Sequence, residues 1–470
     1  MRIVDLTLHR TDVRLRMPFR YGIATMTDGP VLFVRVQLEA DGKRWTGISS
    51  DLLPAKWFTK IPSQPIAEEI AGMLQVIRQA GAIAVGLEGR NAFEIWRQLY
   101  EAQVSWAAAE GIPPLLANFG VSLVERALIE ATAKATGQTV FQMLRSNALG
   151  IRLNLFHPEL GTAEPRDFLN ELPSATVILR HTVGLLDPLL ESEIEAGDRL
   201  EDGLPQSLEA GIRTYRLRHF KLKVSGQVEA DLERLSRCAE IMGRLAPADY
   251  AFSLDGNEQF GSIEEFRVFW DTVRTRPDLR AFLQNLLFVE QPLHRKAALQ
   301  PEVGAAFQHW KERPPIIIDE SDATLADVPL ALDLGYAGTS HKNCKGIFKG
   351  LAHRCLINLR RRSPDHPGLM MSGEDLCNTG PVALLQDLAM MAALGIESVE
   401  RNGHHYHAGL SQFPAAVQES VLRRHEDLYC RSPLGWPTLR VNDGRLALGT
   451  INGAPFGVGF ELDCGLFERC

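Results

Sequence analysis

The feature that most constrains the fold of this chain is a series of short apolar runs, each of which ends in an acid or a lysine. The runs occupy residues 219–224, 251–257, 286–292, 316–321 and 338–346. Apolar runs of this length, separated by segments with helical periodicity, are typical of buried parallel strands. Polar groups at the carboxyl ends of such strands gather on one face, where barrels of alternating strands and helices build their active sites. The series therefore predicts a barrel enzyme.

The number of strand candidates supports a closed barrel. Segments with apolar residues three and four positions apart, which is the helical spacing, lie between them. Eight candidates give the number of strands that closes a (β/α)₈ barrel, so the predicted fold class is α/β. They are residues 175–184, 219–224, 251–256, 286–292, 315–320, 338–343, 368–373 and 396–400.

The segments that flank the barrel have other patterns. The opening of the chain alternates apolar and polar residues like strands and then becomes helical, which is an α+β arrangement. Residues 439–448 contain an Asn-Asp-Gly turn and predict a hairpin. Residues 185–205 are acidic, and their apolar residues have no helical or strand periodicity. This segment predicts a long loop or lid after the first barrel strand. We expect three parts: an α+β capping domain over 1–148, the barrel over 149–412 and a tail over 413–470 that completes the cap.

Composition excludes several classes of protein. The chain has 470 residues, a formal net charge of −8 and no long basic tract, so nucleic acid is not an expected partner. It has no apolar run of about 18 residues, so no membrane span is expected. The first ten residues lack the apolar core of a signal peptide. The 7 cysteines are scattered, odd in number and without a CxxC pair. That pattern favours reduced thiols and a cytoplasmic protein.

Five short motifs give the chain a family resemblance. They are Lys-Leu-Lys at 221–223, Asp-Gly-Asn at 255–257, Glu-Gln-Pro at 290–292, Asp-Glu-Ser at 319–321 and the single Lys342. In this order they resemble the motifs of the enolase superfamily, in its muconate-lactonizing and mandelate-racemase-like branch. The resemblance implies a barrel with a cap, and removal of a proton α to a carboxylate with help from a metal ion.

The chain also departs from that family. Relatives commonly carry Gly-Gly shortly after the sixth-strand lysine, whereas Gly346-Ile-Phe-Lys349 follows here. The chain is longer than most relatives, with the extra residues near 50–115 and 185–205. These differences bear on substrate identity rather than on the fold.

The resemblance assigns the metal and the proton transfers. Asp255, Glu290 and Asp319 would bind Mg²⁺, with Mn²⁺ possible, because hard oxygen donors suit these ions. Lys221 and Lys223 share one strand face, since side chains alternate along a strand. Two neighbouring ammonium groups beside a dication should lower the pKa of a lysine base.

The three lysines would have separate roles. Lys223 would transfer the proton, Lys221 would stabilise the oxyanion, and Lys342 would act from the opposite side of the substrate. Lys345 and Lys349 are expected to be solvated charges.

Other residues are candidates for substrate contact or for packing. Phe19, Tyr21 and Met26 resemble the family's early lid, which excludes water from the site. Packing is the expected role of His341, and the residues at 404–407 are expected in a loop rather than at a zinc site. Further candidate substrate contacts are Asn257, Glu374 and Glu400.

The expected reaction is racemisation, epimerisation or cycloisomerisation of a small carboxylic acid, by a chain that we expect to form a homo-oligomer. One alternative is a dehydratase or lyase acting on a hydroxy or sugar acid. Residues 370–374 lack the histidine that the mandelate-racemase-like branch carries there, which lowers the weight of this alternative. Two others are a catalytically inactive barrel that binds a ligand or a partner, and an aldolase that forms a Schiff base on lysine.

Overall fold

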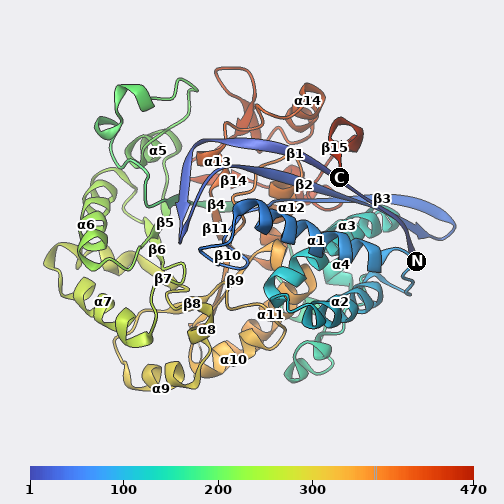
Figure 1. Cartoon of the computed structure of the whole chain (residues 1–470), viewed down its shortest axis with the longest axis horizontal. Helices are drawn as coiled ribbons and strands as arrows, with labels where there is room; N and C mark the ends of the chain where they lie inside the picture. The colour runs from blue at the N-terminus through green and yellow to red at the C-terminus, as the bar shows by residue number, and fades with distance from the viewer. Residues whose placement is uncertain (365, 367) are drawn as a thin grey trace.

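Eight parallel strands close into a barrel in this computed structural model, which describes residues 1–364, 366 and 368–470 (Figure 1). Each strand pairs with the next along the chain, and the last pairs with the first. All eight strands fall on the predicted runs, so the predicted barrel is confirmed. In chain order they are β4 (Thr176–Val183), β5 (His219–Lys223), β6 (Ala251–Asp255), β7 (Leu286–Glu290), β8 (Ile316–Ile318), β9 (Gly338–His341), β10 (Met370–Gly373) and β11 (Ser398–Arg401).

Amphipathic helices surround these strands. In α7, for example, Ile263, Phe266, Trp270 and Val273 recur at helical spacing and are buried, while Ser262 caps the first turn by accepting a hydrogen bond from the Glu265 backbone N–H. The helices that follow the barrel strands are α5 (Leu208–Tyr215), α6 (Val228–Leu245), α7 (Ile263–Thr275), α8 (Arg295–Ala298), α9 (Pro301–His309), α10 (Asp327–Leu334), α11 (Ile347–Arg360), α12 (Ala383–Leu394) and α13 (Gly403–Tyr406).

An antiparallel sheet and four helices form the cap. The sheet consists of β1 (Arg2–Tyr21), β2 (Ala24–Ala40), β3 (Lys43–Leu52) and, beside β1, the short β15 (Glu468–Arg469) from the end of the chain. A β-carbon at Gly47 on β3 would lie 1.9 Å from the carbonyl oxygen of Ala127 on the third helix, so only glycine permits this close packing. The helices are α1 (Ile66–Ala84), α2 (Ala92–Ala109), α3 (Pro114–Thr136) and α4 (Val140–Ser146).

The tail keeps only the turn of the predicted hairpin, closed by one antiparallel bridge between Asn442 and Arg445. The Asn-Asp-Gly turn is present, but β13 (Pro437–Leu439) pairs with β12 (Tyr429–Arg431), and β14 (Arg445–Ala447) pairs with β4 of the barrel. The reason is that β4 begins four residues before Arg180, the first of its residues that pairs with β5, which leaves an open edge on that side that β14 covers. The remaining tail helices are α14 (Ala415–Arg424) and α15 (Gly449–Asn452).

The tail therefore contacts both the cap sheet, through β15, and the barrel, through β14. The domain boundaries near residues 148 and 412 stay a prediction. In the part of the chain that the structure describes, no helix combines the length and the apolar character needed to cross a bilayer.

Residues 185–205 form the long connection that the sequence predicts, interrupted only by 3₁₀ turns. Arg16 of β1 clamps this segment to the cap. Its guanidinium donates to a carboxylate oxygen of Asp202 at 2.9 Å, to the carbonyl of Pro205 at 2.9 Å and to the carbonyl of His405 at 3.0 Å. The long loop is thus fixed against the β1–β2 hairpin and against α13.

A buried polar network joins the cap to the barrel. The Asp51 carboxylate at the end of β3 pairs with Arg126 of α3 and accepts a hydrogen bond from the Asn378 amide at 2.7 Å. The same amide donates to Asp387 of α12 at 3.0 Å, and its oxygen accepts from the Leu52 backbone N–H at 3.1 Å. In a buried network every lost partner leaves a polar group unsatisfied.

Replacing Asn378 should destabilise the whole protein. We expect Asn378→Ala to lower the free energy of unfolding by about 1–3 kcal/mol, the usual cost of leaving buried polar groups without partners. Urea denaturation measures this change. Asn170→Ala, at an exposed asparagine, is the matched control and should stay within about 0.5 kcal/mol of the parent. Equal stability of the two variants would contradict the proposed role of the network.

Candidate active site

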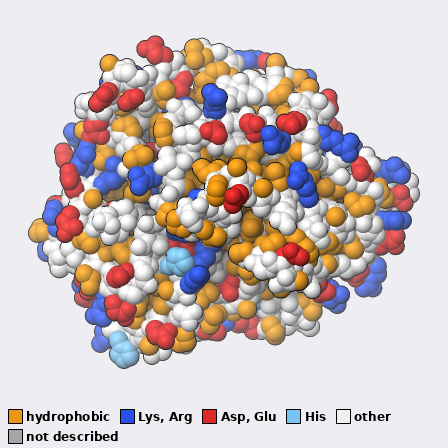
Figure 2. Space-filling model, viewed as in Figure 1, with side chains coloured by type: hydrophobic (Ala, Val, Ile, Leu, Met, Phe, Trp, Pro, Cys, Tyr) orange, Lys and Arg blue, Asp and Glu red, His pale blue; other side chains and the backbone are white. Residues whose placement is uncertain are grey.

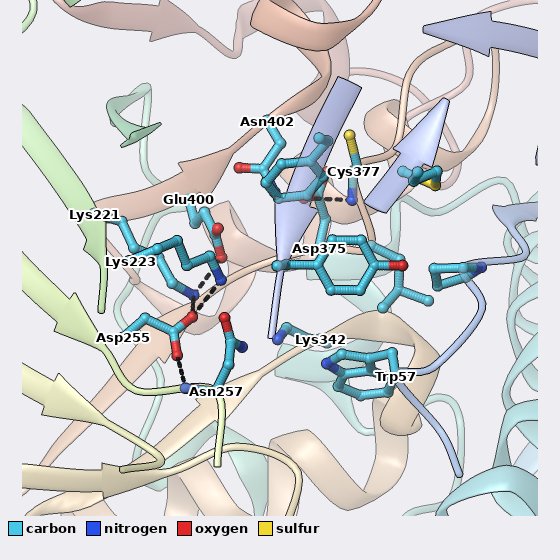
Figure 3. A pocket seen from close by; sticks show the side chains of 15 residues that line it. Trp57, Lys221, Lys223, Asp255, Asn257, Lys342, Asp375, Cys377, Glu400 and Asn402 are labelled. Carbon is cyan, nitrogen blue, oxygen red and sulfur yellow. Dashed lines mark hydrogen bonds and ion pairs between the residues drawn. The ribbon is translucent and has the colours of Figure 1, made fainter. Parts of the chain in front are cut away.

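The predicted site residues lie at the carboxyl ends of the barrel strands, beneath the cap. A pocket opens there between the barrel and the β1–β2 hairpin (Figure 3). On this face of the molecule hydrophobic side chains gather near the centre (Figure 2). Of the predicted residues, those that line the pocket are Phe19, Tyr21, Met26, Lys221, Lys223, Asp255, Asn257, Lys342 and Glu400.

Lys221 occupies the centre of the charged cluster. Its Nζ atom lies 2.7 Å from carboxylate oxygens of Glu290 and Glu400, 2.9 Å from Asp255 and 3.0 Å from Glu374. Burial alone would lower the pKa of this lysine, but the four carboxylates outweigh it and hold the pKa well above its usual range. Lys221 is therefore a fixed positive charge.

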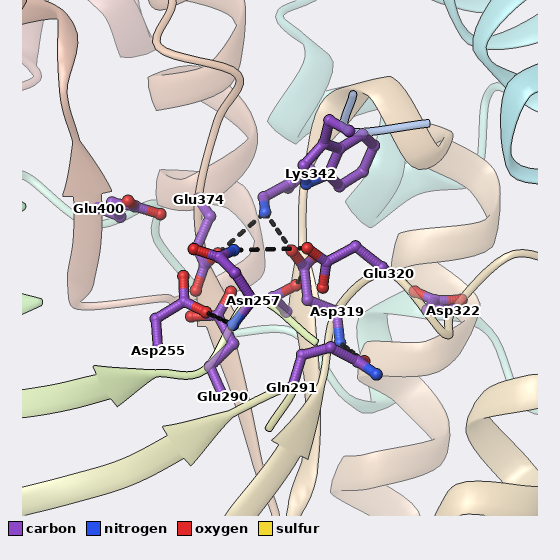
Figure 4. A network of polar contacts seen from close by, with 12 residues as sticks. Asp255, Asn257, Glu290, Gln291, Asp319, Glu320, Asp322, Lys342, Glu374 and Glu400 are labelled. Atoms are coloured by element: carbon purple, nitrogen blue, oxygen red, sulfur yellow. Dashed lines mark hydrogen bonds and ion pairs between the residues drawn. The ribbon is translucent and has the colours of Figure 1, made fainter. Parts of the chain in front are cut away.

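Three carboxylates lie close enough to share one cation. Oxygen atoms of Glu290, Asp319 and Glu374 lie within 4.8 Å of one another, and all three side chains are buried (Figure 4). The predicted third ligand, Asp255, instead places one oxygen against Lys221 and Lys223, at 2.9 and 2.5 Å. Glu374, which the sequence predicts only as a candidate substrate contact, is thus the third member of this cluster.

The state of Glu290 shows that a cation fits this cluster. Neither of its carboxylate oxygens has a hydrogen-bond partner among the described residues, although Lys221 Nζ lies 2.7 Å from one of them. Burial, together with the charges of Asp255 and Glu374, raises the pKa of Glu290 well above its usual range. A divalent cation would relieve this repulsion, and its donors would be hard carboxylate oxygens.

Lys223 and Lys342 reach the acids from different strands. Lys223 Nζ lies 2.5 Å from Asp255, whereas Lys342 Nζ lies 2.5 Å from Asp319 and 3.1 Å from Glu374. Burial favours a low pKa for Lys342, but Asp319 and Glu374 raise the pKa well above its usual range. The acids alone thus raise the pKa values of Lys221 and Lys342. The lowered lysine pKa expected beside a dication stays a prediction.

Lys345 and Lys349 are not solvated, contrary to the sequence-based expectation. Both are buried: Lys345 Nζ lies 3.0 Å from Asp319, and Lys349 Nζ lies 2.9 Å from Asp322. A 3₁₀ turn at Asn343–Lys345 directs the chain inward after β9 and brings both lysines to these partners. Asp322, three residues beyond Asp319, was the available signal for a second buried ion pair.

The histidines are packed rather than exposed. His341 is buried and its Nε2 atom lies 3.1 Å from the amide oxygen of Asn343, which confirms a packing role. The expectation of a loop at residues 404–407 is wrong, because they belong mainly to the buried helix α13. In this helix the Nε2 atom of His404 lies 2.9 Å from the Nδ1 atom of His181, so His404 packs against β4 of the barrel.

The cap closes the pocket through two segments. In the β1–β2 hairpin, Phe19 stacks on Tyr406 with 4.2 Å between ring centroids, and the Tyr21 hydroxyl donates to the Ala55 carbonyl at 2.8 Å. The loop after β3 contributes Trp57, whose ring lies over Lys342 with Nζ 4.9 Å from the centroid. Sequence reasoning missed Trp57, although it lies within the flagged extra region near 50–115.

An ion triad holds that loop on the barrel. Glu258, which follows Asn257, pairs with Lys60 of the loop at 3.1 Å and with Arg295 at 2.8 Å. Arg295 also donates to the Trp57 carbonyl at 2.8 Å. Asn257 and Glu258 adopt left-handed backbone conformations, with φ of 39° and 64°. Such strain in residues other than glycine is commonest at functional sites.

The remaining candidate, Glu400, lies between the barrel and the pocket. One of its oxygens accepts a hydrogen bond from the Thr182 hydroxyl at 2.7 Å, and the other contacts Lys221. Five further residues that the sequence did not single out as substrate contacts line the pocket wall: Pro54, Asp375, Leu376, Cys377 and Asn402.

No family model and no curated protein matches the sequence. Solved structures do match. A muconate lactonizing enzyme from Pseudomonas fluorescens, complexed with muconolactone, aligns with a TM-score of 0.62 at 16% identity, over 100% of this chain and 99% of that chain. A dipeptide epimerase from Enterococcus faecalis V583 aligns with a TM-score of 0.60 at 16% identity, over 98% and 100%. An N-succinyl Arg/Lys racemase from Bacillus cereus gives 0.61 at 16%, over 99% and 97%.

These likenesses extend over nearly the whole chain, at an identity that establishes the fold. They agree with the order of the five motifs and with the position of those motifs at the barrel's carboxyl ends. The chain therefore has the barrel-and-cap fold of the enolase superfamily, as found in muconate lactonizing enzymes, dipeptide epimerases and related racemases.

Proposed function

We propose that this chain is a divalent-metal-dependent enzyme that removes a proton α to a carboxylate, stabilises the enolate, and so racemises, epimerises or cycloisomerises a small carboxylic acid. The observation that carries the proposal is the placement of Lys223 and Lys342. Lys223 is the last residue of β5, and Lys342 directly follows β9. These strands are four positions apart in a closed ring of eight, and both lysines line the same pocket. Two lysines on opposite sides of a carbon can take a proton from one face and return it to the other.

The acids would supply the metal site. An α-proton beside a carboxylate is only weakly acidic, so the enolate needs strong electrostatic stabilisation. Glu290, Asp319 and Glu374 would hold Mg²⁺ or Mn²⁺, with Asp255, the third ligand that the sequence predicts, beside them. When bound, the ion would supply positive charge at the developing enolate oxygens.

The lysines would divide the remaining work. Lys221, surrounded by four carboxylates, keeps its proton and would place a fixed positive charge near the substrate oxygens. Among the acids of the described chain, Lys223 forms an ion pair with Asp255 alone, so forming the neutral amine that a base requires breaks one ion pair rather than four. The hairpin and Trp57 would exclude water from the pocket.

Metal binding can be tested without measuring turnover. A cation that binds only the folded protein stabilises it by about 2.7 kcal/mol at a concentration of 100 times its Kd. We expect Mg²⁺ to raise the melting temperature of the parent protein and to lose this effect in Glu290→Gln, which removes a charge from the cluster. Differential scanning calorimetry with and without Mg²⁺ measures both.

The matched control is Glu320→Gln. Glu320 is buried next to Asp319 in sequence but lies outside the three-acid cluster, so this variant should keep the stabilisation by Mg²⁺. If Mg²⁺ and Mn²⁺ leave the parent's melting temperature unchanged, or if Glu290→Gln responds like the parent, the metal assignment is wrong.

The two lysines should act on opposite configurations of the substrate. We expect Lys223→Ala to abolish α-proton exchange from one enantiomer and Lys342→Ala to abolish it from the other. Each loss should be at least about 10²-fold, the lower range for a general base. Proton NMR in D₂O with separate enantiomers measures the exchange, and Mg²⁺-dependent stabilisation of each variant confirms that the site is intact.

A variant that exchanges both enantiomers at the parent rate would show that its lysine is not a base. If both variants behave in this way, the catalytic proposal fails, and a barrel that binds a carboxylate ligand becomes the better account.

A further inference from the structure

The part of the pocket supplied by the cap and by the loop after β10 is mainly apolar. Phe19 and Met26 come from the β1–β2 hairpin, Trp57 from the loop after β3, and Leu376 from the loop after β10. Their exposed fractions are only 4–7%, and the stacking of Phe19 on Tyr406 fixes one side of this wall. A wall that is formed in advance can bind an apolar group without a cost for ordering its own side chains.

Two acids on the same wall, Asp375 and Glu400, already have partners. Asp375 lies 2.7 Å from Arg401, whose side chain is fully buried and also faces Asp387. Glu400 is held by Lys221 and Thr182. A second carboxylate on a substrate would therefore meet like charges here, and such contacts discriminate between ligands by repulsion.

One polar atom on this wall is free to accept a hydrogen bond. The side-chain oxygen of Asn402 is buried and has no partner among the described residues. In Figure 3, Asn402 and Cys377 lie on the far side of the pocket from Asp255. An acceptor at that position tolerates an uncharged group but not an anion.

We infer that the substrate is a monocarboxylate whose α-carbon carries an uncharged, mainly apolar substituent, aliphatic or aromatic. The inference rests on the proposed function, because it places the single carboxylate at the lysine and acid cluster. The substituent then lies against Phe19, Met26, Trp57 and Leu376. Asp375 and Glu400 disfavour a second carboxylate, and burying hydrocarbon against the apolar wall is favourable.

Three α-methyl acids test this inference by calorimetry on the Mg²⁺-loaded protein. In 2,5-dimethylhexanoate an isopropyl group replaces the second carboxylate of 2-methylglutarate, so the two ligands have nearly the same shape. The third, 2-phenylpropionate, carries an aromatic substituent. We expect both monocarboxylates to bind at least about tenfold tighter than 2-methylglutarate, since like-charge contacts across an interface cost several kcal/mol.

A pair of variants locates the effect on the wall. Met26→Lys places a cation among the apolar residues and should strengthen binding of 2-methylglutarate at least about tenfold while weakening 2,5-dimethylhexanoate. Ile23→Lys adds the same charge to the tip of the same hairpin, outside the pocket lining, and should keep the parent's order. If Met26→Lys does not fold, Met26→Ala should weaken 2,5-dimethylhexanoate and leave 2-methylglutarate unchanged.

The outcomes separate this inference from the proposed function. If 2-methylglutarate binds as tightly as 2,5-dimethylhexanoate, or if none of the three acids binds, the inference is overturned. Proton exchange in D₂O reports independently on the reaction. Binding in the expected order without exchange would refute the reaction and keep the ligand class, whereas exchange that favours 2-methylglutarate would keep the reaction and refute the class.

Discussion

Five carboxylates and four lysines are buried together at the carboxyl ends of the barrel strands, and each charge needs a partner inside that cluster. The acids are Asp255, Glu290, Asp319, Glu374 and Glu400, and the lysines are Lys221, Lys223, Lys342 and Lys345. Lys221 lies on β5 and contacts four of the acids, which lie at the ends of β6, β7, β10 and β11. Its charge therefore links five of the eight barrel strands. Buried charges without partners cost several kcal/mol each, so the barrel can close only in an arrangement that matches them.

The cap takes part in this arrangement rather than merely covering it. The Glu125 carboxylate of α3 accepts hydrogen bonds from the backbone N–H groups of Ile347 and Phe348, at 3.0 and 2.7 Å. These groups form the amino end of α11, where an anion is favoured by the helix dipole. Since α11 follows the 3₁₀ turn after Lys342, a helix of the cap positions the chain that carries one candidate base.

The strands and the motif residues could be predicted because both depend on local pattern. Apolar runs identify barrel strands, and side-chain alternation puts Lys221 and Lys223 on one face. The errors concern partners that are distant in sequence. Whether Lys345 is solvated depends on Asp319, and the pairing of β14 depends on an open edge of β4 more than 260 positions earlier. Trp57 reaches Lys342 only because Arg295 and Glu258 dock its loop, which no local pattern reveals.

The pairing of β1 with β15 has a consequence for the folding of the cap sheet. Arg10 pairs with Glu468 and His9 with Arg469, so this stretch of the second edge of β1 is covered by residues more than 450 positions later in the sequence. Contacts of such separation are the slowest to form, because the intervening chain must first be ordered. Until then β1 exposes an unpaired edge, which other chains can join.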